Sequence, residues 1–298
     1  MKILGRISLG IFLIGLGLVI AGLIAGAGAF RPVTAADYIL VDETYEVGTL
    51  ETIVLSFANK RIDVVPSEDD LIRIVYYVTE EDPVTVTADA TSLAFEEEVD
   101  WTVDWFDFSW LWPVSQEYFQ CTLYLPADAV LALDMSTSNG EIEISELAAL
   151  ATLDAYTSNG AVTLSDVAVA GAIGIVSTNG AFTVNDVLAG ENVSLRTSNG
   201  RITVDALVAS GTVVLKTSNG PVEVDGLVAD NLEVDTSNGR IDVAVIGSYD
   251  DYRILLETSN GSMYVDGVEK NDGSYNVGRT PTIDLDTSNG NVYLDFID

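Results

Sequence analysis

Apolar and polar residues alternate in short runs along most of the chain, and the alternation restarts about every twenty residues. Each restart is marked by the quartet TSNG, or STNG in one copy, and the quartet asparagines are spaced by 20, 20, 20, 20, 19, 22 and 29 residues. Six and four residues before each asparagine, and three and five residues after it, the side chain is apolar in every copy. Alternation with period two on both flanks predicts two short strands per repeat, each with one buried face.

A further apolar residue follows eight places after most of these asparagines, and the first five copies carry another one two places later. This spacing predicts a third short side to the repeat. A coil of about twenty residues with several short sides is the rung of a β-solenoid, in which each rung folds only on its neighbours. The predicted fold class is therefore all-β: a single-chain, β-helix-like solenoid with rungs of about 20 residues, preceded by an N-terminal transmembrane helix.

The quartet itself is predicted to be the corner between two strands. The parity of the apolar positions slips by one at Asn-Gly, and we expect the glycine to supply the positive φ that such a bend needs. Stacked asparagine side chains can also bond from rung to rung. A ligand site in each quartet is the alternative. The predicted corner residues are Asn139, Gly140, Asn159, Gly160, Asn179, Gly180, Asn199, Gly200, Asn219, Gly220, Asn238, Gly239, Asn260, Gly261, Asn289 and Gly290.

The repeat divides the chain into three parts. Residues 1–31 are predicted to be a membrane anchor, residues 38–126 an atypical N-terminal β cap, and residues 127–298 the repeat array. Within the cap, IVLSFANKRIDV aligns as a degenerate copy of the repeat, with Asn59 in the asparagine position. Residues 268–281 lengthen one turn into a loop, and loops often carry binding.

The first thirty residues have the pattern of a membrane anchor. Lys2 and Arg6 precede an uncharged apolar run from residue 7 to residue 30, which as a helix would span roughly 36 Å, enough for a hydrocarbon core of about 30 Å. A cleaved signal peptide is the alternative, although its apolar region usually has only about 7–15 residues. The positive N-terminus predicts a single-pass protein of the cell membrane, with a cytoplasmic N-terminus and an extracytoplasmic repeat domain.

The composition excludes several classes of function. The chain has 46 acidic and 13 basic residues, a net charge of −33, so its surface repels nucleic acid and attracts cations and cationic partners. It has no histidine, which excludes Ser-His-Asp and Cys-His catalysis and imidazole metal sites. Cys121 is the one cysteine, and its alternation with apolar residues predicts a buried thiol.

Two groups of side chains are candidates for chemistry. Every tryptophan lies in one short segment, predicted to be a hairpin over the open end of the solenoid, with membrane contact or carbohydrate stacking as the functional alternatives. The acids seven places after the asparagine should stack about 5 Å apart, as a solvated edge, a weak Ca²⁺ site or, least of all, a catalytic face. No other metal or cofactor is expected. The tryptophans are Trp101, Trp105, Trp110 and Trp112, and the acids are Glu146, Asp166 and Asp186.

The run LYLPADAVLALDMSTSNGEIEISEL and the TSNG copies after it resemble a bacterial and archaeal family of S-N-G β-strand-repeat proteins. Its members are regarded as candidate adhesins of unknown molecular function. The resemblance covers roughly residues 38–298 and implies a β-solenoid on a membrane-anchored or envelope-associated protein. The family has no agreed active site, so the resemblance implies no catalytic residue.

The predicted function is a non-catalytic, membrane-anchored, extracytoplasmic module for binding, adhesion or scaffolding at the cell surface. Its expected partners are the membrane and a surface glycan or envelope protein. One alternative is a carbohydrate-active enzyme that uses the acidic face, which alanine at Asp166 and Asp186 would test. The other is an envelope protein that self-assembles into a homo-oligomer, joined end to end by a last unpaired strand, NVYLDF.

Overall fold

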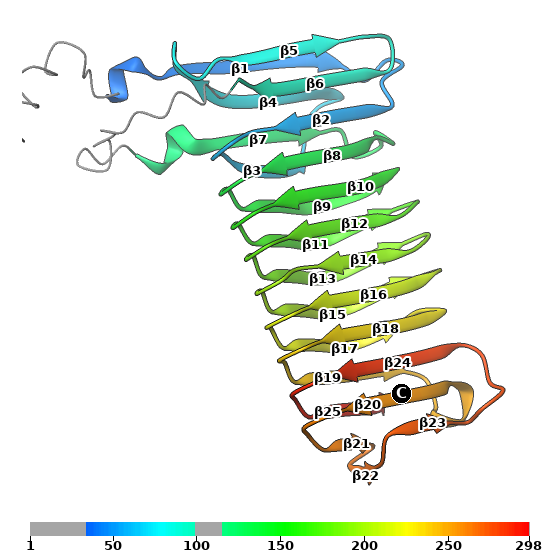
Figure 1. Ribbon diagram of the computed structural model, residues 1–298. Helices are drawn as coiled ribbons and strands as arrows, with labels where there is room; N and C mark the ends of the chain where they lie inside the picture. Colours follow the sequence, from blue (N-terminus) through cyan, green and yellow to red (C-terminus); the bar gives the residue numbers. More distant parts are fainter. Residues whose placement is uncertain (1–33, 99–114, 298) are drawn as a thin grey trace, which may run out of the picture. The chain divides into compact units, whose positions relative to one another are not determined.

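A computed structural model describes residues 34–98 and 115–297 of the chain (Figure 1). These residues fall into two compact units, and most of the first unit lies outside the described ranges. Residues 34–38 belong to the first unit and contain the short 3-10 helix η1 (Ala35–Asp37), where the Thr34 N–H and hydroxyl both donate to Asp37 Oδ2. The predicted anchor, residues 1–31, lies outside the described residues. Among residues 34–98 and 115–297, no helix has the length and apolar character needed to cross a bilayer.

The second unit contains residues 39–98 and 116–297 and consists of two large sheets. In spatial order, the thirteen-stranded sheet comprises β1 (Ile39–Glu46), β4 (Leu71–Val78), β7 (Gln120–Leu125), β3 (Arg61–Pro66), β9 (Ile142–Leu150), β11 (Val162–Val169), β13 (Phe182–Ala189), β15 (Ile202–Ala209), β17 (Val222–Val228), β19 (Ile241–Ile246), β25 (Val292–Ile297), β21 (Met263–Val265) and β22 (Val268–Lys270). The twelve-stranded sheet comprises β23 (Gly273–Tyr275), β20 (Arg253–Thr258), β24 (Thr282–Thr287), β18 (Asn231–Thr236), β16 (Thr212–Thr217), β14 (Val193–Arg196), β12 (Ile173–Ser177), β10 (Thr152–Thr157), β8 (Ala132–Thr137), β2 (Thr52–Ser56), β6 (Ser92–Glu97) and β5 (Val84–Ala88). Two further 3-10 helices are η3 (Gln116–Phe119) and η4 (Tyr249–Asp251).

Each regular rung contributes one strand to each sheet, and corresponding strands of successive rungs pair in parallel (Figure 1). The register repeats the sequence period, since Leu153 pairs with Leu133 on one side and Ile173 on the other. The apolar side chains at the predicted offsets point between the two sheets and form one continuous buried core. Cys121 is fully buried there, and burial raises the pKa of its thiol. The prediction of an all-β protein built from repeated, parallel, stacked strands is confirmed.

The predicted third side is wrong as a separate side, because its residues continue the same strand. In β11 the buried positions are Val162 and Leu164, and then Val167 and Val169, so the parity flips between Leu164 and Val167 while the strand stays in its sheet. The residue at the flip is Asp166, whose φ is +56°. Left-handed residues occupy the same place in neighbouring rungs. They are Glu146, Asp186, Ala206 and Gly226.

Spatial order departs from chain order at both ends of the stack. Strands β24 and β25, which come last in the chain, lie between the rung of β18 and β19 and the rung of β20 and β21. At the other end, β2 and β3 lie next to β8 and β9, although β6 and β7 come between them in the chain. At the C-terminal end the chain therefore places an outer rung first and returns to fill the gap beneath it. At the N-terminal end it adds β6 and β7 outside β2 and β3 and then continues on the other side of that rung.

This order overturns the prediction that NVYLDF is an unpaired terminal strand. It forms most of β25, which pairs with β19 on one edge and with β21 on the other. Because both edges are already paired, this strand cannot join two molecules end to end. The outer edges at this end belong to β22 and β23, which are three residues long and antiparallel to their neighbours.

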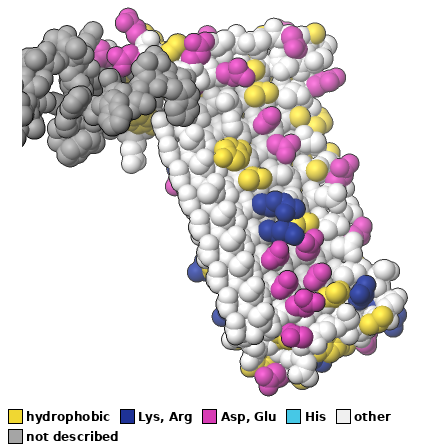
Figure 2. All heavy atoms as spheres, in the orientation of Figure 1, with side chains coloured by type: hydrophobic (Ala, Val, Ile, Leu, Met, Phe, Trp, Pro, Cys, Tyr) yellow, Lys and Arg dark blue, Asp and Glu magenta, His cyan; other side chains and the backbone are white. Residues whose placement is uncertain are grey.

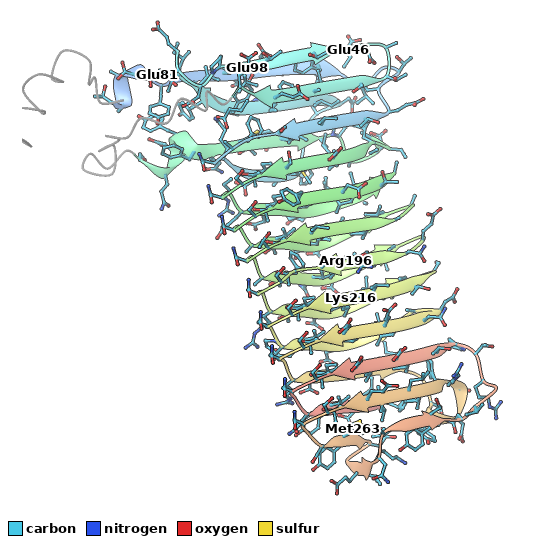
Figure 3. The ribbon with its side chains drawn as sticks, in the orientation of Figure 1. Glu46, Glu81, Glu98, Arg196, Lys216 and Met263 are labelled. Carbon is cyan, nitrogen blue, oxygen red and sulfur yellow. The ribbon has the colours of Figure 1, made fainter. Side chains whose placement is uncertain are left out.

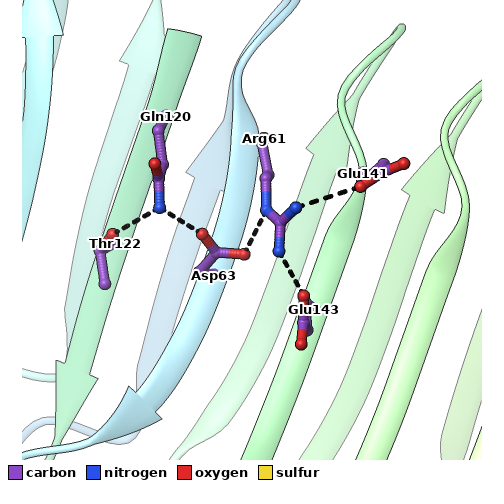
Figure 4. A network of polar contacts seen from close by, with 6 residues as sticks. All are labelled: Arg61, Asp63, Gln120, Thr122, Glu141 and Glu143. Carbon is purple, nitrogen blue, oxygen red and sulfur yellow. Dashed lines mark hydrogen bonds and ion pairs between the residues drawn. The ribbon is translucent and has the colours of Figure 1, made fainter. Parts of the chain in front are cut away.

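Residues 39–98 and 116–126 continue the same two sheets as the regular array. Strands β2 and β3 form a regular rung with Asn59 at its corner, while β1, β4 and β5 pair antiparallel beyond it. The outer face near this junction carries a polar network (Figure 4). The Arg61 guanidinium donates to Asp63, Glu141 and Glu143, and Gln120 donates to the second oxygen of Asp63 at 2.6 Å. This network connects β7, β3 and β9 across the point where chain order is broken.

Candidate functional site

The quartet asparagines form one continuous ladder of hydrogen bonds. From Asn139 onward, each Nδ2 donates to the Oδ1 of the asparagine in the preceding rung, over 2.6 to 2.9 Å. The ladder starts at Asn59, so the degenerate copy takes part in it. At its far end it runs from Asn238 to Asn289 and then to Asn260, following the spatial order of the rungs. Each inner asparagine amide is thus used between rungs.

The first residue of each quartet forms a second ladder inside the corner. The buried Thr197 hydroxyl donates to the carbonyl of Gly180 in the preceding rung at 3.0 Å and accepts the N–H of Gly200 at 3.2 Å. Thr137 and Thr157 make the same two bonds in their rungs. The quartet therefore satisfies its own polar groups within the corner, as a buried bend requires.

The quartet glycines do not have the positive φ that the sequence suggested, and that expectation is wrong. The left-handed glycines of the described residues lie elsewhere, at Gly48, Gly226, Gly247, Gly267, Gly273 and Gly278. What requires glycine in the corner is the close approach of one rung to the next. A Cβ on Gly160, Gly180, Gly200 or Gly220 would lie against the preceding glycine's carbonyl oxygen, far inside the 3.0 Å that real Cβ atoms keep.

The two ladders predict unequal costs for two substitutions in one corner. Thr197→Val keeps the shape of the side chain but leaves the Gly180 carbonyl and the Gly200 N–H buried without a partner, which should lower the free energy of unfolding by about 2–3 kcal/mol. Asn199→Ala breaks three exposed bonds, with Asn179, Thr178 and Asn219, that water can replace, so it should cost about 1 kcal/mol or less. Urea unfolding of both variants measures the difference. A larger loss for Asn199→Ala would contradict this account of the corner.

The acids proposed for Ca²⁺ or catalysis occupy the left-handed bend of the thirteen-stranded sheet. Glu146, Asp166 and Asp186 have φ values of 58°, 56° and 51°, and all three side chains are exposed. Asp tolerates this conformation better than most residues, which gives these positions a conformational reason for their residue type. Within residues 34–98 and 115–297, no group of three or more acids or cysteines is arranged to hold a metal ion. The four tryptophans, Trp101, Trp105, Trp110 and Trp112, lie outside the described residues.

A different set of side chains stands out on the outer face of the twelve-stranded sheet. Three residues before each quartet asparagine from Asn159 onward, the side chain points outward, and register pairing aligns these side chains in one line across seven strands. We call this line the outer row. It consists, in spatial order, of Tyr156, Val176, Arg196, Lys216, Asp235, Asp286 and Glu257.

The outer row changes in character along its length. Tyr156 and Val176 are 46% and 43% exposed, the two cations follow, and three acids complete the row. Figure 2 shows the two basic side chains beside an acidic group on this face, and Figure 3 labels Arg196 and Lys216 on adjacent strands. The buried columns beneath the row stay apolar from rung to rung. The strands under the outer row therefore have the same apolar buried face in every rung, while their exposed side chains differ from rung to rung.

The two cations of the row are in different electrostatic states. Lys216 Nζ lies 2.5 Å from Glu233 Oε1 and 3.8 Å from Asp235 Oδ2, so acids of the next strand already neutralise it. Arg196 Nε donates to Ser194 Oγ at 3.0 Å, and no carboxylate of the described ranges lies within ion-pair distance of its guanidinium. Arg196 thus presents a free cation beside two exposed apolar side chains on a protein of net charge −33.

Acids crowd one another at the far end of this face. Burial, and then the charges of Glu233, Glu257 and Asp286, raise the pKa of Asp284. Burial, Asp235 and Glu257 likewise raise the pKa of Asp286. A raised pKa in the folded state means that ionisation destabilises the fold as the pH rises from the unfolded-state value through the folded-state value.

Neutralising one of these acids should therefore stabilise the protein near neutral pH. Asp284→Asn is expected to raise the thermal midpoint at pH 7 and to change it much less at pH 3, where the carboxyl group is protonated in both states. Thermal melts followed by circular dichroism at the two pH values measure the effect. A lower midpoint for Asp284→Asn at pH 7 would show that the charge of Asp284 is stabilising.

The outer row could have been found in the sequence, because all its members share one offset from the quartet. Unlike the apolar offsets, this offset varies in chemistry from copy to copy, from Tyr and Val through Arg and Lys to Asp and Glu. The signal was the variation itself, at a position that lies between a constantly apolar residue and the constant Thr or Ser of the quartet.

Residues 50–295 match the family described as Toastrack DUF4097. Two solved structures are similar to the chain. One is a candidate cell adhesion protein from Clostridium sporogenes, with 9% identity, coverage of 87% of this chain and 100% of that chain, and a TM-score of 0.32. The other is a candidate adhesin from Bacteroides fragilis, with 13% identity, coverage of 90% and 100%, and a TM-score of 0.42. No curated protein matches the sequence.

Proposed function

Because this chain belongs to the Toastrack DUF4097 family, whose model spans residues 50–295, we propose that it is a non-catalytic binding or scaffold module of the cell surface. The proposed partner is an envelope glycan or protein that carries acidic groups. The contact surface is the outer row, and its principal contacts are Tyr156, Val176 and Arg196, which lie next to one another at one end of the row.

The unpaired guanidinium of Arg196 carries this proposal. In a protein with 46 acidic residues a cation usually finds a carboxylate, whereas Arg196 lies beside the exposed Tyr156 and Val176 column instead. Arginine binds carboxylate and phosphate groups in a two-pronged geometry, and aromatic rings stack on sugars and planar groups. Paired strands in fixed register hold the backbone that carries these groups, which reduces the entropy lost on binding.

Binding to isolated cell envelopes tests the proposal. Arg196→Glu in the full chain should weaken binding about tenfold or more, because a charge-assisted contact becomes a repulsive one. The matched control is Arg201→Glu, which reverses a charge on the other sheet, where Arg201 pairs with Glu223 at 2.7 Å. Equal binding by wild type and Arg196→Glu would refute the outer row as the contact surface.

The absence of catalysis and the location at the membrane are also proposals. The array is proposed to stand outside a cell membrane, anchored by residues 1–31 with Lys2 and Arg6 on the cytoplasmic side. The repeat domain should sediment with intact cells. Protease added to those cells from outside should then degrade it. Polysaccharide degradation should be the same with wild-type protein and with the variant that has alanine at Asp166 and Asp186. A loss of polysaccharide turnover in the variant would favour an enzyme.

A further inference from the structure

At the C-terminal end of the stack, an ammonium group lies over two tyrosine rings. Lys270 Nζ is 5.3 Å from the ring centroid of Tyr249 and 5.5 Å from that of Tyr275. Both distances fall within the roughly 6 Å over which an aromatic face attracts a cation. In the described part of this acidic chain, no carboxylate lies within ion-pair distance of Lys270. The rings are therefore the principal partners of this ammonium group.

Contacts that do not involve Lys270 hold both rings in place. The Tyr275 hydroxyl donates to the Asn271 carbonyl at 2.5 Å and accepts the Asn271 N–H at 3.1 Å. The Tyr249 ring packs edge-to-face on Phe296 with centroids 6.1 Å apart, and its carbonyl accepts a bond from Asn276 Nδ2 at 2.8 Å. Both tyrosines also pack against the core while remaining partly exposed. The rings can therefore keep their positions if the lysine leaves.

The lysine itself is held more loosely than the rings. Lys270 ends β22, a three-residue edge strand in which Val268 is 59% exposed, and the side chain of Lys270 is half-buried. This strand belongs to the loop of residues 268–281, which interrupts the repeat. The net charge of −33 also concentrates cations near the surface.

We propose that Tyr249 and Tyr275 form a binding site for an ammonium group of the quaternary-ammonium class, and that Lys270 occupies this site as an internal plug. A ligand ammonium enters by displacing Lys270, whose side chain then extends into solvent. This site is separate from the outer row, lies at another part of the fold and does not depend on the function proposed above.

The test compares choline with its uncharged carbon isostere, 3,3-dimethylbutan-1-ol, by NMR titration of the full chain in a maltoside detergent at constant ionic strength. Lys270→Ala should bind choline about tenfold more tightly than wild type, because the internal competitor is gone. The isostere should bind both proteins equally weakly. In the Lys270→Ala background, Tyr249→Phe keeps a ring and should retain choline binding, whereas Tyr249→Leu should lose most of it.

Three results would overturn the proposal. They are no gain in affinity from Lys270→Ala, a gain that Tyr249→Leu leaves intact, and equal binding of choline and the isostere. A measurement on the wild-type chain guards against variants that misfold. The Lys270 Hε protons should be shifted upfield by the two rings and should move toward their ordinary position as choline is added; unshifted Hε protons would also overturn the proposal.

Discussion

Gly200→Ala should lower the free energy of unfolding by about 3 kcal/mol or more. At a glycine whose φ suits other residues, alanine usually stabilises by about 0.4–1 kcal/mol, because it restricts the unfolded chain. Gly200 does not have a left-handed φ, so backbone conformation alone predicts stabilisation. The new Cβ, however, would collide with the Gly180 carbonyl, and the rungs cannot separate locally because both sheets fix their spacing. Steric overlap therefore makes Gly200→Ala destabilising rather than stabilising.

Urea unfolding of Gly200→Ala, followed by far-ultraviolet circular dichroism, measures this effect. The matched control is Ser198→Ala, two residues away in the same quartet, because Ser198 is only partly buried and does not belong to the core. It should stay within about 0.5 kcal/mol of wild type. If Gly200→Ala is neutral or stabilising, the rungs do not approach one another closely at the corner.

Ending the chain after Pro281 should destabilise the C-terminal part of the stack by several kcal/mol. The missing strands β24 and β25 carry Ile283, Leu285, Val292 and Leu294, each at most 1% exposed. At about 1.5–3 kcal/mol for each buried side chain, their loss removes roughly 6–12 kcal/mol of burial. The rung of β20 and β21 loses its parallel partners at the same time. We expect residues 247–281 to lose their order, while the central rungs remain folded.

Hydrogen exchange distinguishes this outcome from a shift of the outer rung into the gap. Amides of β20 and β21 should lose protection in the shortened chain, while those of β10 to β15 keep it. The matched control is a chain that ends after Ile246, which lacks the outer rung altogether. The two shortened chains should have similar stability, because residues 247–281 add little without β24 and β25. Full protection of β20 after truncation at Pro281 would mean that this rung packs directly on β18 and β19.

The regular part of the fold was predictable because each rung obeys one local pattern. Apolar offsets around the quartet identified the buried positions of both sheets, and Asn59 was placed in the asparagine column from twelve residues of sequence. The reason for the corner glycines was not predictable in the same way. A glycine repeated in every copy indicates that a side chain is not tolerated there. The sequence alone does not show whether the reason is a left-handed φ or close backbone packing. Only the distance between rungs separates the two.

The arrangement of the ends and the candidate sites were harder to predict for a related reason. The insertion of β24 beneath β20 depends on which rung pairs with which, and every rung has nearly the same apolar pattern. The third side was mistaken because a left-handed residue such as Asp166 flips the parity without ending the strand. The loop at residues 268–281 was predicted to be a candidate for binding. The contact of Lys270 with Tyr249, however, joins residues 21 positions apart, and no local sequence pattern indicates it.

The insertion of the last strands also determines when the protein can finish folding. A chain emerges from the ribosome or an export channel with its N-terminus first, and most repeat arrays can add rungs in that order as they emerge. Here residues 282–297 emerge after residues 253–265, yet they occupy an inner place between that rung and the rung of β18 and β19. The final rungs therefore cannot close until residues 282–297 have emerged. A chain that stops before residue 282 would leave these rungs unpaired, with exposed apolar residues by which proteases and chaperones could distinguish it from a chain that contains β24 and β25.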